Sequence, residues 1–178
     1  MHRQKLALLV VILLGGGAVL VSYASALLAD PATLEAAWGA VTGQLRQVYV
    51  IFQLLAALGY LAYTYFILFR LDPNEAQIAN RFGFWAFILI YVAILIPSAL
   101  YMPLTFRMLK QPSTGVWCTI RVVLAIVGLA SLGLTLSLLA LRPRHPVWAY
   151  WLAVAGSVAF SIQTALLDAV IWPAVFPL

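Results

Sequence analysis

The residues that could carry acid–base, nucleophilic or metal chemistry are few in this chain. It has two histidines, five acidic residues and one cysteine among 178 residues. His2 is terminal, His145 follows two arginines in a short loop, and Cys118 has no second cysteine to pair with. No Ser/His/Asp set, carboxylate dyad or metal-ligand spacing can be assembled from them. We therefore expect no catalytic residues and no metal site, and a protein that is not an enzyme.

The composition identifies the elements that must position any functional residue. The chain is 65% hydrophobic and 8% charged, with a mean hydropathy of +1.05, whereas a soluble domain carries roughly 25% charged residues. Apolar windows of membrane-crossing length recur along it. We expect an all-α polytopic membrane protein, a single five-helix transmembrane domain over residues 1–178, with spans at about 6–28, 48–69, 84–106, 117–141 and 147–172.

The connections between these spans are short, apart from the first. Residues 30–41 predict a short amphipathic helix at the membrane interface, carrying Trp38 at headgroup level. After the second span, Asp72-Pro73-Asn74 predicts a turn followed by a helical restart. GGG at 15–17 is not a phosphate loop, because no Lys-Ser/Thr follows it.

The basic residues predict the orientation and argue against nucleic acid as a partner. They stand singly or in pairs at the ends of the spans, which is typical of contact with a lipid bilayer. Six fall on the side of the amino terminus and three on the other: Arg3, Lys5, Arg70, Arg81, Arg142 and Arg144 against Arg46, Arg107 and Lys110. The positive-inside rule then places the amino terminus in the cytoplasm and the carboxyl terminus outside.

Polar side chains inside the spans predict a ligand pocket in the outer half of the bundle. Gln53, Ser98, Tyr101 and Gln163 all fall in the outer leaflet if the orientation is correct. Pro97 frees a backbone carbonyl one turn earlier, and such backbone survives at membrane depth where it lines a cavity or is covered by protein. The predicted ligand-binding residues combine aromatic walls with hydrogen-bonding groups: Phe52, Gln53, Tyr60, Ser98, Tyr101 and Gln163.

Two charged residues lie near the rim of this predicted pocket. Arg121 is about one turn into the fourth span, and Asp168 is close to the outer end of the fifth. They are candidates for an ion pair. The alternative is that both side chains reach the outer headgroups independently.

The fifth span carries small residues at every fourth position along its length. They are Ala149, Ala153, Ser157, Ser161, Ala165 and Ala169. Small residues at this spacing let two helix backbones approach closely in lipid. This helix interface is either tight packing within one bundle or the seam of a homodimer.

Two resemblances to known families arise from short motifs. Arg144-His145-Pro146 followed by Trp148 resembles the signature of membrane isoprenylcysteine and phospholipid methyltransferases. In those families the cofactor site continues through a further stretch with acidic and basic residues. Here one helix follows, with Asp168 as its acidic residue.

The architecture resembles the tryptophan-rich sensory protein family (TspO, the peripheral benzodiazepine receptor type). That family has five helices in a chain of this size and a long first loop, and its third helix carries Asn-x-x-Trp-x-Pro-x-Phe-Phe. Ser98, Tyr101, Pro103, Thr105 and Phe106 meet this spacing, with the proline and one phenylalanine identical. The resemblance implies a pocket for tetrapyrroles, such as heme or another porphyrin, or for sterol-like lipids.

Three functions are thus open from the sequence. The first is binding of a hydrophobic small molecule in the outer-half pocket, for transport or sensing, with no cofactor identified beyond a possible heme or porphyrin ligand. The second is a structural or accessory membrane subunit, or a homodimer without a ligand. The third is a membrane methyltransferase.

Overall fold

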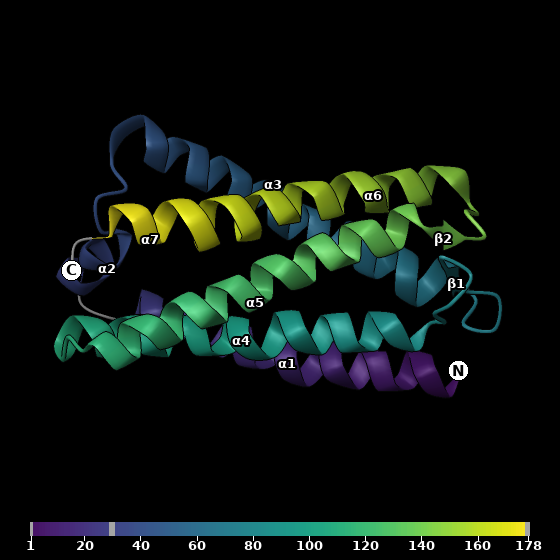
Figure 1. The fold of residues 1–178 in the computed structure, drawn as a ribbon, viewed down its shortest axis with the longest axis horizontal. Coiled ribbons are helices and arrows are strands. Elements are labelled where there is room, and N and C mark those ends of the chain that lie inside the picture. The colour runs from purple at the N-terminus through teal and green to yellow at the C-terminus, as the bar shows by residue number, and fades with distance from the viewer. Residues whose placement is uncertain (1, 29–30, 177–178) are drawn as a thin grey trace.

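The structure is a computed structural model that describes residues 2–28 and 31–176, without the side chains of residues 26 and 27. Five of its helices are long and apolar enough to cross a membrane: Arg3–Ser25, Gly43–Arg70, Trp85–Lys110, Thr114–Leu139 and Val147–Val175. The five predicted spans are thereby confirmed. The chain is an integral membrane protein with an all-α, five-helix architecture (Figure 1).

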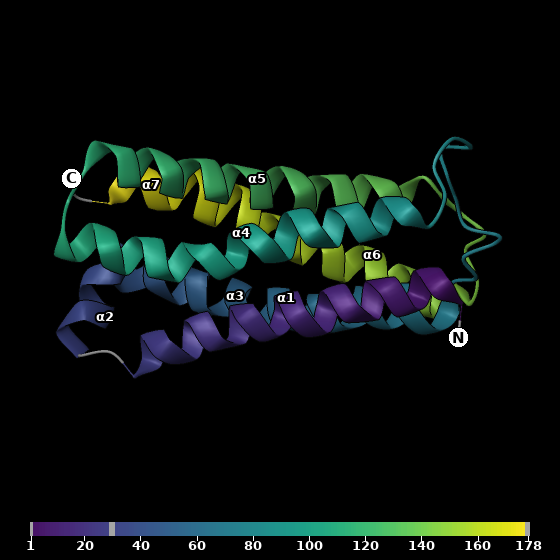
Figure 2. The same cartoon turned by 90° about the horizontal axis from the view of Figure 1, so that it is seen from below.

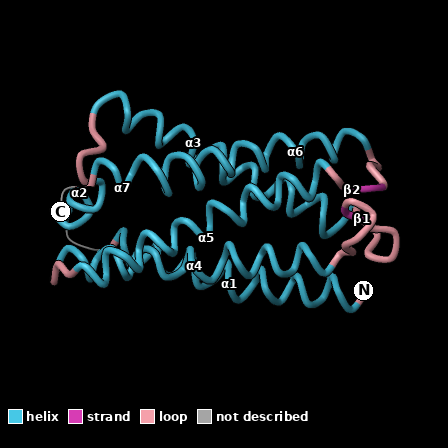
Figure 3. Tube along the Cα trace, viewed as in Figure 1, coloured by secondary structure: helices cyan, strands magenta, loops and turns pink. Residues whose placement is uncertain are grey.

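The elements follow the chain in one order. They are α1 Arg3–Leu27, α2 Pro31–Trp38, α3 Gly43–Tyr65, η1 Phe66–Arg70, β1 Gln77–Ile78, α4 Trp85–Lys110, α5 Thr114–Leu139, β2 Leu141–Arg142, α6 Val147–Ser161, η2 Ile162–Ile171 and α7 Trp172–Val175. One end of the bundle, the α2 end, holds α2 and α7, and the opposite end, the β end, holds β1 and β2 (Figures 1 and 3). The short helix predicted in the first loop is α2.

The helices pack in a defined order around the bundle. α4 lies between α1 and α5, α5 contacts α6 and η2, and α3 packs mainly on α6. Figure 2 shows α1 running beside α4 along the bundle. The outer surface of the helices is apolar, with Leu14 and Leu20 of α1 each 72% exposed. This is expected where acyl chains cover the protein.

Glycines allow the closest approaches between helices. α3 crosses α6 at Gly59 and Gly156, where a Cβ on Gly156 would lie 2.7 Å from the Cα of Gly59. α5 meets η2 at Gly128, where a Cβ would lie 2.9 Å from the Cα of Ala165. In lipid, the hydrophobic effect does not drive helices together. Van der Waals packing at such backbone contacts stabilises their association instead.

Two segments are wound more widely than an α-helix. η1 and η2 are π-helical, and the Leu71 amide donates to the carbonyl of Phe66, five residues earlier, at 3.0 Å. A stretch of ten π-helical residues such as η2 is rare, and wide turns of this kind occur often at functional sites. The pattern of apolar residues carried no sign of either segment.

The connection after η1 differs from its prediction. The predicted turn forms, since the amides of Glu75 and Ala76 donate to the Asp72 carbonyl. The predicted helical restart is wrong: Gln77–Ile78 pair with Leu141–Arg142 as an antiparallel ladder. This distant strand offers backbone partners that local sequence cannot reveal.

A tight turn follows β1 and brings Ile78 opposite Phe82, with which it forms an isolated antiparallel bridge. The amide of Arg81 donates to the carbonyl of Ile78 at 3.1 Å, and both central residues, Ala79 and Asn80, have positive φ, 51° and 57°. This is the pattern of a type I′ turn. Asn tolerates the left-handed conformation, whereas Ala adopts it at a cost.

The buried side chains form two clusters along the bundle axis. The β half is centred on Tyr63, Phe66, Phe87, Tyr91 and Tyr150. The α2 half contains Val41, Tyr49, Met108, Trp117, Ile120, Leu124, Leu167, Trp172 and Phe176, with Phe52 and Tyr101 packed against it. The core of the bundle is therefore divided into two separately packed halves.

Candidate functional site

Hydrogen-bonding side chains buried in the bundle gather where α5 meets α6 and η2. The hydroxyl of Thr164 lies 2.8 Å from the Oγ of Ser131, which donates to the carbonyl of Gly128 at 2.7 Å. One helical turn away, Thr135 and Ser161 share a hydrogen bond of 3.0 Å. These interhelical bonds satisfy hydroxyls that would otherwise be unpaired in lipid. They fix the position of η2 against α5.

Gln163 and Asp168 form the central polar pair of the site. The Nε2 of Gln163 donates to Oδ1 of Asp168 at 2.8 Å. Residues five apart on an α-helix point about 140° away from each other, whereas i→i+5 winding brings them to neighbouring faces. The π-helical form of η2 therefore makes this pair possible.

Three tyrosines from other helices interact electrostatically with the Asp168 carboxyl. The hydroxyls of Tyr23 on α1, Tyr49 on α3 and Tyr101 on α4 all lie within electrostatic range of it. Tyr49 is held there because its hydroxyl donates to the carbonyl of Leu167 at 2.6 Å. The polar cluster, defined as these three tyrosines with Gln163 and Asp168, thus joins four elements distant in sequence.

One atom of the polar cluster has no partner. The side chain of Gln163 is 4% exposed, and its Oε1 makes no hydrogen bond among the described residues. A buried acceptor without a donor costs about 1–3 kcal/mol, and more in hydrocarbon. The cluster can therefore accept a hydrogen bond from a molecule that carries a donor.

Aromatic rings close the α2 end above this cluster. Trp172 packs against Tyr101 at 5.6 Å and against Phe176 at 4.6 Å between ring centroids. The Nε1 of Trp172 donates to the carbonyl of Ala37 at 3.2 Å, which ties α2 to the bundle. The first loop therefore covers this end of the bundle, and aromatic rings pack beneath it where the sequence predicts an open pocket.

The structure brings together some of the predicted ligand-binding residues and separates others. Phe52 and Tyr101 pack on the α2 half, and Gln163 is buried within it. Ser98 is half-buried on α4, one turn before Tyr101. Tyr60 belongs to the β half, where its ring lies 5.5 Å from that of Tyr63.

Two of the predicted roles are corrected by the structure. Gln53 is exposed on the outer surface of α3 and does not line the polar cluster, because its neighbour Phe52 occupies the inward face. The ion pair between Arg121 and Asp168 does not form. Arg121 is exposed, Asp168 is bonded to Gln163, and the one ion pair within the described ranges joins Arg46 to Glu35. Contact of Arg121 with lipid headgroups, the alternative for this residue, stays a prediction.

The stripe of small residues on the fifth span lies inside the chain. Ala149, Ala153, Ser157 and Ser161 are at most 6% exposed, and Ala165 meets Gly128 of α5. Of the two interpretations, packing within one bundle accounts for this face. A homodimer stays a prediction, and its seam would have to use another surface.

The sequence did not single out the tyrosine group in the β half. The rings of Tyr60, Tyr63 and Tyr91 contact one another, with centroids 5.5–6.1 Å apart, and Thr64 shares a hydrogen bond of 2.7 Å with Tyr91. The hydroxyls of Tyr60 and Tyr63 are buried with no hydrogen-bond partner among the described residues. The helical period of about 3.6 residues places Tyr60, Tyr63 and Thr64 on one helix face. This spacing is the sequence feature that could have indicated the group.

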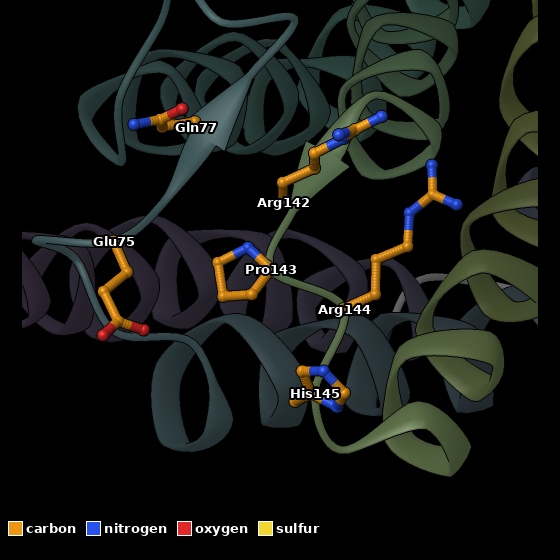
Figure 4. Close-up of a pocket in the computed structure, with 6 residues that line it drawn as sticks. All are labelled: Glu75, Gln77, Arg142, Pro143, Arg144 and His145. Atoms are coloured by element: carbon orange, nitrogen blue, oxygen red, sulfur yellow. The ribbon is translucent and has the colours of Figure 1, made fainter.

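A surface pocket lies at the β end, outside the apolar bundle. It has a volume of about 630 Å³ and is lined by Glu75, Gln77, Arg142, Pro143, Arg144 and His145 (Figure 4). Arg144 and His145 of the Arg-His-Pro motif therefore line a basic pocket. The methyltransferase interpretation of that motif stays a prediction.

Comparison with known proteins gives no relative. No family model, no curated protein and no solved structure matches the chain. Within residues 2–28 and 31–176, no three His, Cys, Asp or Glu side chains lie together as a metal site. The function of this protein therefore has to be inferred from the geometry of the chain itself.

Proposed function

We propose that this integral membrane protein binds a predominantly apolar small molecule through the polar cluster of the α2 half. The observation that carries the proposal is the Oε1 of Gln163, a buried acceptor with no donor among the described residues. Intramembrane polar and ionisable groups commonly mark ligand or ion pathways. Asp168 and the hydroxyls of Tyr49 and Tyr101 would complete the polar end of the site.

The cluster has a route to the membrane along α1. Tyr23 of this helix is 41% exposed while its hydroxyl lies within range of Asp168. α1 packs mainly on α4, so few contacts with α3 oppose its displacement. A lipid-soluble molecule would enter between α1 and α3, with Phe52 and Tyr101 supplying apolar walls.

The geometry favours one of the two ligand classes that the tryptophan-rich sensory protein resemblance implies. A sterol-like lipid brings a single hydroxyl that can donate to Gln163. A porphyrin such as heme brings propionates, and a second carboxyl close to Asp168 would be repelled or would have to be protonated. We therefore propose a sterol-like ligand ahead of a tetrapyrrole, with transport or sensing as the use of the site.

The test is a binding titration with both ligand classes. Purified protein is titrated with a photoreactive sterol and, separately, with protoporphyrin. Gln163→Met removes the acceptor but keeps an unbranched side chain, and we expect sterol affinity to fall about tenfold, the effect of one buried hydrogen bond.

Gln53→Met is the matched control, because it makes the same chemical change on the exposed face of α3. It should leave binding unchanged. Equal effects of the two substitutions, or no saturable binding of either probe, would remove the proposal.

The orientation is part of the proposal. The excess of basic residues at the β end supports a cytoplasmic β end and an external α2 end. A membrane-impermeant maleimide should label Gln111→Cys but not Asn74→Cys in intact cells, both in a Cys118→Ser background. The reverse pattern would invert the orientation and place the polar cluster in the inner leaflet.

A further inference from the structure

The pocket at the β end has two arginines on one side and an acidic residue on the other. Figure 4 shows Arg142 of β2 and Arg144 of the following loop extending in the same direction, while Glu75 extends away from them. His145 continues the wall below Arg144. The basic side of the pocket is therefore a paired guanidinium surface.

The two arginines differ in how firmly they are held. Arg144 donates through Nη2 to the carbonyl of Leu139 at 2.7 Å and through Nε to that of Leu141 at 3.2 Å. Its guanidinium also lies 5.3 Å from the ring centre of Tyr150. Arg142 takes part in no ion pair or side-chain hydrogen bond within the described part of the chain. Arg144 is thus preorganised, and the charge of Arg142 is uncompensated.

The position of the pocket indicates where a ligand would come from. Arg142 and Arg144 lie between the end of α5 at Leu139 and the start of α6 at Val147, at the limit of two membrane spans. Trp148 and Trp151, 58% and 54% exposed, come directly after them, as in the aromatic belt at the headgroup level. A molecule bound here would have its polar end in the pocket and could keep its apolar part in the bilayer.

The charge of the whole β end has the same sign. Six basic residues lie there against two acidic ones: Arg3, Lys5, Arg70, Arg81, Arg142 and Arg144 against Asp72 and Glu75. Basic pockets between transmembrane helices bind anionic lipid headgroups. Guanidinium groups match phosphoryl oxygens in geometry and can bond them in pairs.

We propose that this pocket binds the phosphoryl group of an anionic phospholipid, with Arg142 as the principal contact and Arg144 as the fixed second donor. The site is independent of the polar cluster, because the two lie at opposite ends of the bundle. Glu75 lowers the positive potential of the pocket and sets an upper limit on its affinity for anions.

The experiment measures lipid retention by native mass spectrometry. The protein is titrated in detergent with phosphatidylglycerol and with phosphatidylcholine, which have the same acyl chains. We expect saturable binding of phosphatidylglycerol in preference to phosphatidylcholine. Arg142→Gln should weaken it about fivefold, the effect of one cation at an anionic lipid surface, and Glu75→Gln should strengthen it.

Arg81→Gln is the matched control, because Arg81 lies at the same end but does not line the pocket. It should leave the preference unchanged. If Arg81→Gln and Arg142→Gln weaken binding equally, the attraction is a general charge effect and the site is overturned. An absence of preference between the two lipids overturns it as well.

A separate titration with inorganic phosphate distinguishes the two sources of a phosphoryl group. Weak phosphate binding alongside strong retention of phosphatidylglycerol, both reduced by Arg142→Gln, supports the lipid. Phosphate binding that depends on Arg142 without any lipid preference would assign the pocket to a soluble phosphorylated compound and overturn the lipid source.

Discussion

In the β half of the bundle, tyrosine hydroxyls are buried against other aromatic rings, whereas in the α2 half they lie within electrostatic range of a carboxyl. Tyr63 and Tyr91 belong to the first group, and Tyr49 and Tyr101 to the second. Both halves are aromatic and both contain an unpaired polar atom among the described residues. The difference is that only the α2 half combines this atom with an intramembrane acid.

The two halves of the bundle differ in the residues that lie where their helices meet. α3 and α6 touch at Gly59 and Gly156, where no side chain separates the backbones. Towards the α2 end, the rings of Trp172 and Tyr101 pack against each other, and η2 supplies the long polar side chains. Close backbone contact occurs there too, because Gly128 of α5 meets Thr164 and Ala165 of η2. The two halves therefore differ in their polar groups more than in how closely their helices pack.

The largest loss of stability is expected at the crossing of α3 and α6. Gly59→Leu places a side chain against the backbone of Gly156, so the crossing has to separate. We expect a loss of at least about 4 kcal/mol of stability, enough to abolish folded protein. Recovery of monodisperse protein in detergent measures it. Gly17→Leu, at a glycine whose Cβ would meet nothing within 4 Å, should be tolerated. If both variants fold equally well, the crossing is not needed to hold α3 against α6.

The aromatic filling of the α2 half should show the next largest effect. Trp172→Ala removes the ring that contacts Tyr101, Trp117 and Phe176 and should cost about 3 kcal/mol. Thermal unfolding in detergent measures the loss. Trp148→Ala, at a ring 58% exposed, should cost much less. Similar losses for both would mean that the α2 half is not packed as described.

The polar pair should show a moderate coupling energy. In a double-mutant cycle, Gln163→Leu and Asp168→Leu should couple by about 1 kcal/mol, because each single change leaves its partner unpaired and the double change does not. Equilibrium unfolding in mixed micelles supplies the four stabilities. Thr64→Val with Tyr91→Phe gives the corresponding cycle in the β half. A coupling near zero for Gln163 and Asp168 alone would mean that the pair is not formed in the membrane.

The turn at the β end should show the smallest effect, and with the opposite sign. Ala79→Gly removes the cost of a left-handed alanine and should stabilise the protein by about 0.5–1 kcal/mol. A small rise in the unfolding temperature is the expected measurement. Ala76→Gly, at a buried neighbour outside the turn, should destabilise instead. A fall in stability with Ala79→Gly would place the turn in another conformation.

The local physics of the sequence predicts the spans but not their partners. The windows 84–106 and 147–172 correspond to helices Trp85–Lys110 and Val147–Val175, because apolar length and charged ends are properties of one segment. The exposure of Gln53 and the burial of Gln163 could not be predicted in this way. Both are glutamines in apolar helices, and the neighbouring helix decides which of them faces inward.

The sequence also could not predict which side chains and which strands pair with each other. Opposite charge and similar depth suggested Arg121 with Asp168, yet Asp168 is bonded to Gln163. Side chains five residues apart point in different directions on an α-helix and do not meet. The π-helical winding of η2 brings them close enough to form a hydrogen bond. The strand pairing of Gln77–Ile78 with Leu141–Arg142 likewise depends on two loops meeting at one end of the bundle.

Composition and segment length set three properties: that this chain lies in a membrane, how many times it crosses, and which residues are polar at depth. These properties derive from the transfer free energy of each segment, which depends on composition alone. Only the packing of the helices settles which polar residues meet, which face lipid, and that aromatic rings fill the α2 half. Those outcomes depend on helix rotation and on close contacts at single glycines, and no segment carries that information without its neighbours.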